Sequence, residues 1–193
     1  MAYIAQKGGK IWMKITKDRF LEPVRQNVHR KGIDEFLDWL EGTDFFEAPA
    51  STKHHGAYEG GLMQHSWNVY RLLEDSPYLG KFDEESVEIV SLFHDICKIG
   101  LYRKVADVEN AAAFKWEHAK TALPLGHGEK SVHLLQRFIQ LTDDEAVAIS
   151  WHMGGFDQRV VGGSKEIGDA YSMSALALEL HLADMRATYI VEK

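Results

Sequence analysis

The chain has 193 residues, of which 45% are hydrophobic and 26% are charged, and this composition is typical of a soluble globular protein. The formal charge of −7 argues against the broad basic surface that long nucleic acids require. No stretch approaches the roughly 18 consecutive apolar residues of a membrane span, and the N-terminus lacks the apolar block of a signal peptide. The single cysteine, Cys97, excludes an internal disulfide. We therefore predict a cytoplasmic protein with no membrane contact.

The chain shows neither internal repeats nor a linker, and its four prolines are spread out, so we predict one domain over residues 1–193. Residues 1–44 are expected to be a helical N-terminal extension of that domain. Within it, hydrophobic periodicity predicts a helix over residues 17–29 and a shorter one over residues 33–40. Residues 44–59 lack such a pattern and are interpreted as a connecting loop.

Two helices with a strong apolar face are predicted in the middle of the chain. The first covers residues 61–74, and its apolar face carries Leu62, His65, Val69 and Leu72. The second covers residues 84–98, and its apolar face carries Val87, Val90, His94 and Cys97. The apolar surface of this second helix is widened further by Leu92, Phe93 and Ile96. We therefore expect the second helix to be central and largely buried.

The segment over residues 101–117 is ambiguous between irregular structure and strands. It carries aromatic and β-branched residues on both sides of Glu109-Asn110, namely Tyr102, Val105, Phe114 and Trp116. A small hairpin that turns at Glu109-Asn110 is therefore expected.

The second half of the chain is predicted to be helical. A helix is expected over residues 128–140. The sequence from Thr142 to Glu145 is a capping box that opens the next helix, which ends near His152. A long terminal helix is expected over residues 170–191. Together the elements predict an all-α helical bundle with at most one small β-hairpin.

Ionisable residues interrupt three of the predicted apolar helices. His94 and Asp95 stand together in one of them, His65 lies in another, and Asp184 lies in the terminal helix. Buried ionisable groups are costly unless they are paired or bound to a metal. One such residue is most often a satisfied core histidine or a capped aspartate. Three helices that each bring an imidazole or a carboxylate into a core predict a metal site instead.

This set of residues resembles the HD-domain metal-dependent phosphohydrolases, whose pattern is a histidine, then His-Asp, then a distant aspartate. In this chain the pattern corresponds to His65, His94-Asp95 and Asp184, and the resemblance extends over most of the chain. The sequence of residues 53–65 is most similar to the HD domain of bacterial 3′–5′ exoribonucleases, in which an oligonucleotide-binding domain accompanies it. We expect that second domain to be absent here.

The resemblance implies an HD-domain helical bundle with a binuclear metal centre. The core metal ligands that it implies are His65, His94, Asp95 and Asp184. In binuclear members, histidines at places similar to His127 and His152 hold a second metal, and the motif aspartate bridges the two ions. The alternative for each histidine is a role at a helix end, where a cation is favoured at the C-terminus. The mixed ligands suit divalent ions of Mn, Fe, Co, Ni or Zn, of which we expect two.

Asp95 and Lys98 are the predicted catalytic residues. Related enzymes use a lysine at the position of Lys98 to hold the substrate phosphate. The favourable placement of a cation at a helix C-terminus is an equally good explanation for that lysine. Substrate contacts are also expected at the rim of the site from Lys53, His54 and His55, for which a solvated loop is the alternative.

The function implied by these residues is that of a metal-dependent phosphohydrolase, which cleaves a phosphoester of a nucleotide or short oligonucleotide with a metal-activated hydroxide. Its partner would be this small phosphorylated substrate. The alternatives are a metal- and nucleotide-binding regulatory module without turnover, and a 3′–5′ exoribonuclease. No segment predicts a base-specific pocket. The aromatic residues that could stack on a base, or lie in the core instead, are Tyr58, Trp116, Trp151 and Phe156.

Overall fold

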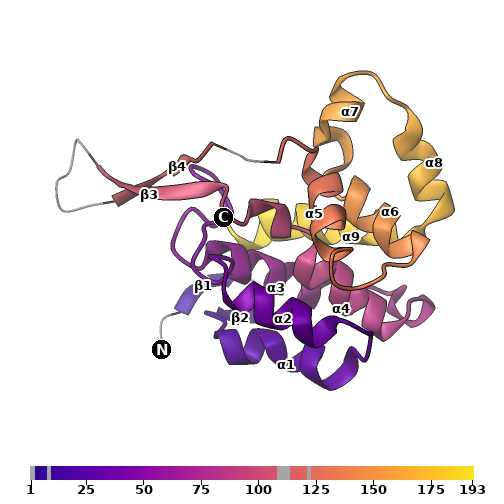
Figure 1. Ribbon diagram of the computed structural model, residues 1–193, viewed down its shortest axis with the longest axis horizontal. Helices are drawn as coiled ribbons and strands as arrows, with labels where there is room; N and C mark the ends of the chain where they lie inside the picture. Colours follow the sequence, from indigo (N-terminus) through magenta and orange to yellow (C-terminus); the bar gives the residue numbers. More distant parts are fainter. Residues whose placement is uncertain (1–2, 8–9, 108–113, 121–122) are drawn as a thin grey trace.

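The computed structural model describes residues 3–7, 10–107, 114–120 and 123–193 (Figure 1). The α-helices of these residues are α1 (Lys17–Asn27), α2 (Ile33–Glu41), α3 (Gly61–Glu74), α4 (Glu84–Phe93), α5 (His127–Leu135), α6 (Asp143–Trp151), α7 (Gln158–Val161), α8 (Glu166–Met173) and α9 (Ala175–Arg186). The shorter turns are the 3₁₀ segments η1 (Leu79–Lys81), η2 (Ile96–Lys98) and η3 (Gly154–Phe156), and the π-helical segment η4 (Ala187–Val191). The strands are β1 (Tyr3–Lys7), β2 (Lys10–Met13), β3 (Tyr102–Ala106) and β4 (Phe114–His118).

Helices dominate the described structure, which confirms the predicted helical bundle with a small β-hairpin. The predicted hairpin is formed by β3 and β4, which pair antiparallel with Tyr102 opposite His118 and project from the helical body (Figure 1). The expected turn at Glu109-Asn110 lies outside the described residues. None of the described helices combines the length and the apolar character that a membrane crossing requires.

The start of the chain differs from the predicted helical extension over residues 1–44. Strands β1 and β2 pair antiparallel with Lys7 opposite Lys10, and the first helix begins only at Lys17. The sequence between the two strands is Gly8-Gly9, a dipeptide common in two-residue hairpin connections. Glycine inside a helix also costs about 1 kcal/mol relative to alanine, so this stretch is a poor continuation of a helix. The predicted helices within the extension are α1 and α2.

The central helix ends earlier than the expected boundary at residue 98. Helix α4 begins after Asp83, whose side chain accepts a hydrogen bond from the backbone of Ser86, and it ends at Phe93. Asp95 has φ −105° and ψ 15°, which lies near the sparsely populated bridge region in which many active-site residues are found. A 3₁₀ turn then carries the chain to Lys98. The helix therefore breaks at the His-Asp pair.

The long terminal helix predicted over residues 170–191 is divided in the structure. Residues up to Met173 belong to α8, and Ser174 has an extended backbone with φ −125° and ψ 106°. The hydroxyl of Ser174 accepts a hydrogen bond from the backbone of Ala177, 3.0 Å away, and so caps the start of α9. A serine in this role marks a helix start, which hydrophobic periodicity alone does not distinguish from a helix interior.

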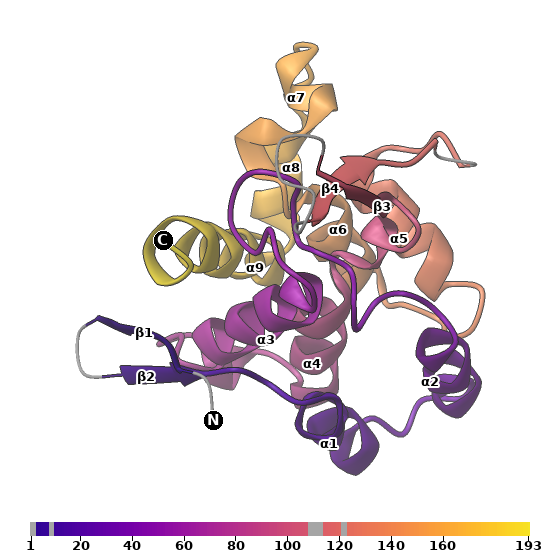
Figure 2. The same ribbon diagram turned by 90° about the vertical axis from the view of Figure 1, so that its left-hand side faces the viewer.

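The helices that carry the predicted ligands share one core. Helix α3 packs along α4, and α9 lies against both α3 and α6 (Figure 2). Aromatic rings fill the space toward α1 and α2, and those with no exposed surface are Phe20, Phe36, Phe45 and Phe93. The rings of Phe36 and Phe93 meet edge to face, with centroids 4.9 Å apart, an arrangement that aromatic pairs prefer.

A partly buried ion pair network fixes α4 relative to α6. The guanidinium of Arg30, in the turn after α1, lies 2.8 Å from Glu85 at the start of α4 and 2.6 Å from Glu145 at the start of α6. Glu145 has no exposed surface, and it also forms the predicted capping box with Thr142. One cation therefore holds the first turns of two helices whose opposite ends carry predicted metal ligands.

Candidate metal centre

The structure brings all six predicted metal ligands together, although they come from separate elements. His65 lies in α3, Asp184 lies in α9, and His127 is the first residue of α5. His94 directly follows α4 and is itself followed by Asp95, while His152 directly follows α6. The centre is therefore assembled by packing of the helices around a single carboxylate, that of Asp95.

His65 is held from both sides of its ring by carboxylates. Its Nε2 lies 3.1 Å from Oδ1 of Asp184 and 3.7 Å from Oδ2 of Asp95, and its Nδ1 lies 3.1 Å from Oε1 of Glu192. Burial lowers the pKa of His65, but Glu192 and Asp184 outweigh it and raise the pKa to about 10. A carboxylate on one ring nitrogen of a histidine orients the other nitrogen toward a metal, so Glu192 positions Nε2.

His94 and His152 present bare nitrogens to the centre of the site. Both are fully buried, and their Nδ1 atoms donate to the backbone carbonyls of Ser91 (2.9 Å) and Ile149 (2.7 Å). Nδ1 therefore carries the proton, and the opposite Nε2 is a lone-pair acceptor in each neutral ring. Neither Nε2 has a hydrogen-bond partner. Two buried acceptors without a donor fit a cation placed between them and the carboxylate of Asp95.

The two oxygens of Asp95 face different histidines. Oδ2 lies 3.7 Å from Nε2 of both His65 and His94. Oδ1 lies 2.7 Å from Nε2 of His127 and 3.5 Å from Nε2 of His152. The four histidines thus fall into two pairs, one on each oxygen of the same carboxylate.

Lys98 is a direct partner of Asp95, because its Nζ lies 2.6 Å from Oδ2. Burial raises the pKa of Asp95, but the Lys98 ammonium and the hydrogen bond from His127 outweigh it and hold the pKa well below its ordinary value. Burial lowers the pKa of Lys98, and the same carboxylate raises it above its ordinary value. Asp95 is therefore an anion and Lys98 a cation throughout the neutral pH range.

His127 differs from the other histidines in its surroundings. Its Nε2 lies 3.4 Å from Sγ of Cys97 as well as 2.7 Å from Asp95. Burial lowers the pKa of His127, but Cys97 and Asp95 raise it to about 10. Binding of a metal at His127 requires that the ring lose this proton. Cys97, predicted on the apolar face of a buried helix, therefore lies beside the centre.

The donor atoms lie close enough to one another to hold a metal ion. Within 4.8 Å of one another lie donors of His65, His94 and Asp95, and likewise donors of His94, His152 and Asp184. All five of these residues are buried. Buried histidine and aspartate clusters of this kind are capable of binding a metal.

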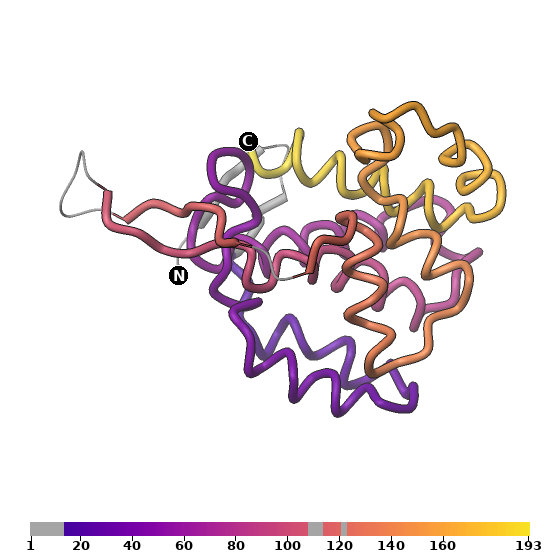
Figure 3. The backbone as a smooth tube through the Cα atoms, turned by 45° about the horizontal axis from the view of Figure 1, so that its top comes forward, coloured from indigo at the N-terminus to yellow at the C-terminus, as the bar shows by residue number. Residues whose placement is uncertain are grey.

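A cavity of about 250 Å³ opens onto the centre. Its walls include the loop after α2, the His-Asp turn and the C-terminal segment. Figure 3 shows the loop after α2 beside the C-terminal end of the chain. The lining residues are Ala50, Ser51, His55, His65, Asp95, Lys98, Tyr102, His127, Met153, Phe156, Asp184, Met185, Thr188 and Tyr189.

Only one of the three substrate residues predicted at the rim of the site lines this cavity. His55 lines it and its ring centroid lies 4.8 Å from that of His65. Burial, helped by His65 and Lys98, lowers the pKa of His55 to about 4, so this ring is neutral near pH 7. Lys53 and His54 are exposed and lie outside the lining of the cavity, and their contact with substrate stays a prediction.

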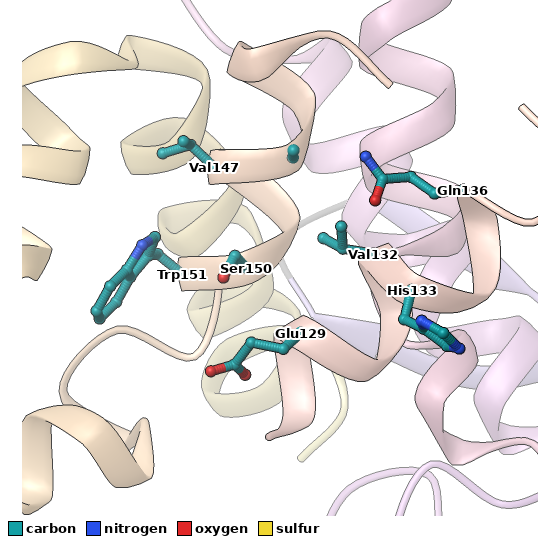
Figure 4. A pocket seen from close by; sticks show the side chains of 8 residues that line it. Glu129, Val132, His133, Gln136, Val147, Ser150 and Trp151 are labelled. Atoms are coloured by element: carbon teal, nitrogen blue, oxygen red, sulfur yellow. The ribbon is translucent and has the colours of Figure 1, made fainter. Parts of the chain in front are cut away.

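Most of the aromatic residues considered for base stacking lie away from the centre. Trp151 lines a second cavity of about 370 Å³ between α5 and α6 (Figure 4), and the guanidinium of Arg159 lies 3.6 Å from the centre of its ring. Trp116 lies in the β3–β4 hairpin beneath Lys104. Of the four candidates, Phe156 alone lines the cavity at the metal centre.

Glu192 and Tyr189 were missed by the sequence analysis. A signal for Glu192 did exist, because it follows Asp184 by eight residues and positions i and i+8 share a face of a helix. A carboxylate at this spacing is nevertheless common on solvated helix faces. Its contact with His65, far away in the sequence, is what identifies it.

Comparisons of the chain with protein-family models, with curated proteins and with solved structures found no match. The functional evidence in this protein is the chemistry and geometry of the residues at the centre. That geometry is a buried cluster of histidines and aspartates that could hold a metal ion, with a lysine beside it at the foot of an open cavity.

Proposed function

We propose that this protein is a metal-dependent phosphohydrolase of the HD type, which cleaves a phosphoester of a nucleotide or short oligonucleotide. The observation that carries the proposal is the pair of buried Nε2 atoms of His94 and His152. Both lack a hydrogen-bond partner, and both lie within 3.7 Å of the carboxylate of Asp95. A neutral imidazole acceptor beside a carboxylate is the donor set that transition metals bind.

We propose two metal ions, because the four histidines divide between the two oxygens of Asp95. His65, His94 and Asp184 would hold one ion together with Asp95, and His127 and His152 would hold the other together with the same carboxylate. The mixture of imidazole and carboxylate donors suits Mn, Fe, Co, Ni or Zn.

The metal ligands and the other residues that line the cavity would have different roles in the reaction. Metal ions held here would lower the pKa of water and neutralise charge on the phosphoryl oxygens. Lys98 holds its ammonium charge and lines the cavity, so it binds a non-bridging phosphoryl oxygen. His55 is neutral and lines the same wall. It accepts a hydrogen bond from the substrate without adding charge. Burial of the proposed ligand residues keeps bulk water out of the centre on the side away from the cavity.

The proposal is tested by incubating the protein, loaded in turn with Mn, Co, Ni, Fe and Zn, with a panel of mononucleotides, short oligonucleotides and model esters. We expect release of inorganic phosphate or of a nucleotide, and loss of that release in Asp95→Asn. His133→Ala is the matched control, because His133 is exposed on α5 and lines the second cavity instead. The proposal is wrong if no ester is cleaved with any of the five metals.

The same experiment separates the alternatives. Tight nucleotide binding without cleavage would identify a regulatory module. Processive shortening of single-stranded RNA, with binding that weakens steeply as salt is raised, would identify an exoribonuclease.

A further inference from the structure

Two exposed aromatic rings lie at the rim of the metal-site cavity. Phe156, in η3, is 55% exposed, and Tyr189, in η4, is 47% exposed. Both line the cavity that also contains Asp95 and Lys98. They come from elements that are distant in the sequence, so the fold, rather than local chain geometry, places them together.

The geometry of this pair differs from that of the core aromatics. The rings of Phe36 and Phe93 cross at 82° with centroids 4.9 Å apart, which is an edge-to-face contact. The rings of Phe156 and Tyr189 are instead inclined by only 24°. Their centroids are 6.5 Å apart, close to twice the ~3.4 Å spacing of stacked nucleotides along a DNA strand. The rim therefore presents two nearly parallel ring faces.

The size of the cavity explains why part of a ligand must lie at the rim. About 250 Å³ is available beside the metal ligands, whereas pockets that enclose a whole small ligand measure roughly 300–1,000 Å³. A phosphoryl group and the adjoining part of a sugar would occupy that space. The remainder of the molecule would then leave the cavity beside Phe156 and Tyr189. The faces of these two rings can pack against a planar apolar group.

We propose that Phe156 and Tyr189 form a stacking site for the base of a nucleotide whose phosphate lies at Asp95 and Lys98. This inference rests on the proposed phosphohydrolase function and specifies its substrate class: nucleotides are preferred to sugar phosphates that lack a base. Stacking uses the π-face that every base has, so it tolerates different bases. The site therefore selects for the presence of a base rather than for its identity.

The test measures binding separately from turnover. The probes are the phosphonate analogues of adenosine 5′-monophosphate and of ribose 5-phosphate, in which carbon replaces the bridging oxygen and blocks hydrolysis. Calorimetry with the Mn-loaded protein is expected to show tighter binding of the adenosine analogue. Phe156→Ala and Tyr189→Ala should each weaken that binding by about 5- to 150-fold, and should leave binding of the ribose analogue unchanged.

Two further variants complete the design. Phe156→Trp keeps a ring at the position and should retain the preference for the adenosine analogue. Phe114→Ala is the matched control, because Phe114 is 66% exposed but lies on the β3–β4 hairpin. It should bind both probes as the wild type does.

The outcomes distinguish this inference from the proposed function. Equal binding of the two probes by the wild type, equal losses for both probes in the variants, or no binding of either probe overturns the stacking site. A base preference that depends on the two rings supports it, even in a protein that cleaves no ester. Cleavage of ribose 5-phosphate as efficiently as of the nucleotide would leave the hydrolase standing and the stacking site rejected.

Discussion

Glu192 accepts a hydrogen bond from Nδ1 of His65 at 3.1 Å, across 127 positions of the sequence. The same carboxylate accepts a second bond, of 2.9 Å, from the side chain of Asn68 in the next turn of α3. The C-terminal segment therefore contributes more than the predicted ligand Asp184. It also fixes which nitrogen of His65 faces the centre.

Removal of Glu192 is expected to weaken metal binding without removing a ligand. Loss of such an outer partner of a metal-binding histidine typically lowers affinity 10–100-fold. Glu192→Ala should show a loss of this order for Mn in calorimetry. Glu192→Gln keeps an acceptor for Nδ1 of His65 and should therefore retain part of the metal affinity that Glu192→Ala loses. Glu117→Ala, on the hairpin, is the control, and equal affinity in Glu192→Ala and in this control would contradict the positioning role.

Asp95→Asn is expected to destabilise the metal-free protein. Burial alone would favour the neutral amide, but the buried ammonium of Lys98 lies 2.6 Å from this carboxylate. Breaking a buried ion pair by removing one partner costs about 3–5 kcal/mol. The variant should therefore melt below the metal-free wild type, and the double variant with Lys98→Met should recover much of the loss.

Addition of Mn should then stabilise the wild type and not Asp95→Asn, because a ligand that binds only the folded state raises its stability by mass action. Thermal melting with and without Mn measures both effects. A variant that gains the same metal-dependent stability as the wild type would show that Asp95 does not bind the metal.

His127→Ala should reduce the metal content from two equivalents to one. His127 faces Oδ1 of Asp95, whereas His65 and His94 face Oδ2, so the first ion keeps its ligands. Elemental analysis of the purified protein gives the count. His133, labelled in Figure 4 on the same helix, supplies the control His133→Ala. Unchanged metal content in His127→Ala would remove this histidine from the centre.

Gly128→Ala is expected to disturb the second metal position through the packing of α5 on α6. A Cβ atom at Gly128 would lie 2.3 Å from the backbone oxygen of Ser150, so α5 must move away from α6. Overpacking of this kind costs about 1–3 kcal/mol. It would also separate His127 from His152, whose ring centroids are 5.3 Å apart. Metal content should fall toward one equivalent, and the melting temperature should fall as well.

Gly168→Ala is the control for that variant. Gly168 lies inside α8 with no heavy atom within 4 Å of a Cβ at that position. Alanine there should stabilise the helix by about 0.5–1 kcal/mol. A Gly128→Ala protein with unchanged stability and metal content would show that the close approach of α5 and α6 does not fix the site.

Arg30→Met should destabilise the protein by about 3–5 kcal/mol at neutral pH, because it leaves the buried carboxylate of Glu145 without its cation. Burial raises the pKa of Glu145, but Arg30 and Ser86 outweigh it and lower the pKa below 4.5. In the wild type this carboxylate therefore stabilises the fold above pH about 4.5, and the contribution is lost as the pH falls through the lower pKa of the folded state.

In Arg30→Met the same carboxylate is buried without its cation, so its protonation at low pH relieves the unfavourable burial of its charge. The difference in unfolding free energy between variant and wild type should narrow as the pH falls from 7 toward 4. Urea denaturation at several pH values measures it. Arg25→Met is the control, because the Arg25–Glu41 pair is exposed and should contribute less than about 1 kcal/mol. A difference that is independent of pH would contradict the assignment.

Features that are determined by a short stretch of sequence could be predicted from the sequence. The capping box at Thr142 and the apolar face of α3 are each contained within a few turns, and the structure has both. The predicted ligand residues were identifiable because a buried imidazole or carboxylate in an apolar segment conflicts with its surroundings unless something compensates its charge.

The remaining features depend on contacts between distant parts of the chain. The helix break at Asp95 occurs inside a continuous apolar run, where periodicity favours continuation. Ser174 ends one helix and caps the next, and the pattern on both sides remains helical. The contacts of Glu192 with His65 and of Tyr189 with Phe156 join the terminal segment to α3 and η3, and no local pattern in the sequence indicates them. Sequence patterns describe faces of helices, not which faces meet.

The proposed ligands of the centre are spread along the chain from α3 to α9, so a bound ion would act as a cross-link between segments that are otherwise joined by packing, hydrogen bonds and ion pairs. Such a cross-link closes long loops and removes conformations from partly unfolded states. In the metal-free protein, α9 could open while α3 and α4 stay folded, because local opening needs only its own contacts to be broken. With metal bound, opening of α9 would require release of a ligand. Backbone amides of α9 and α3 would then exchange with solvent at a common rate, as parts of one cooperative unit.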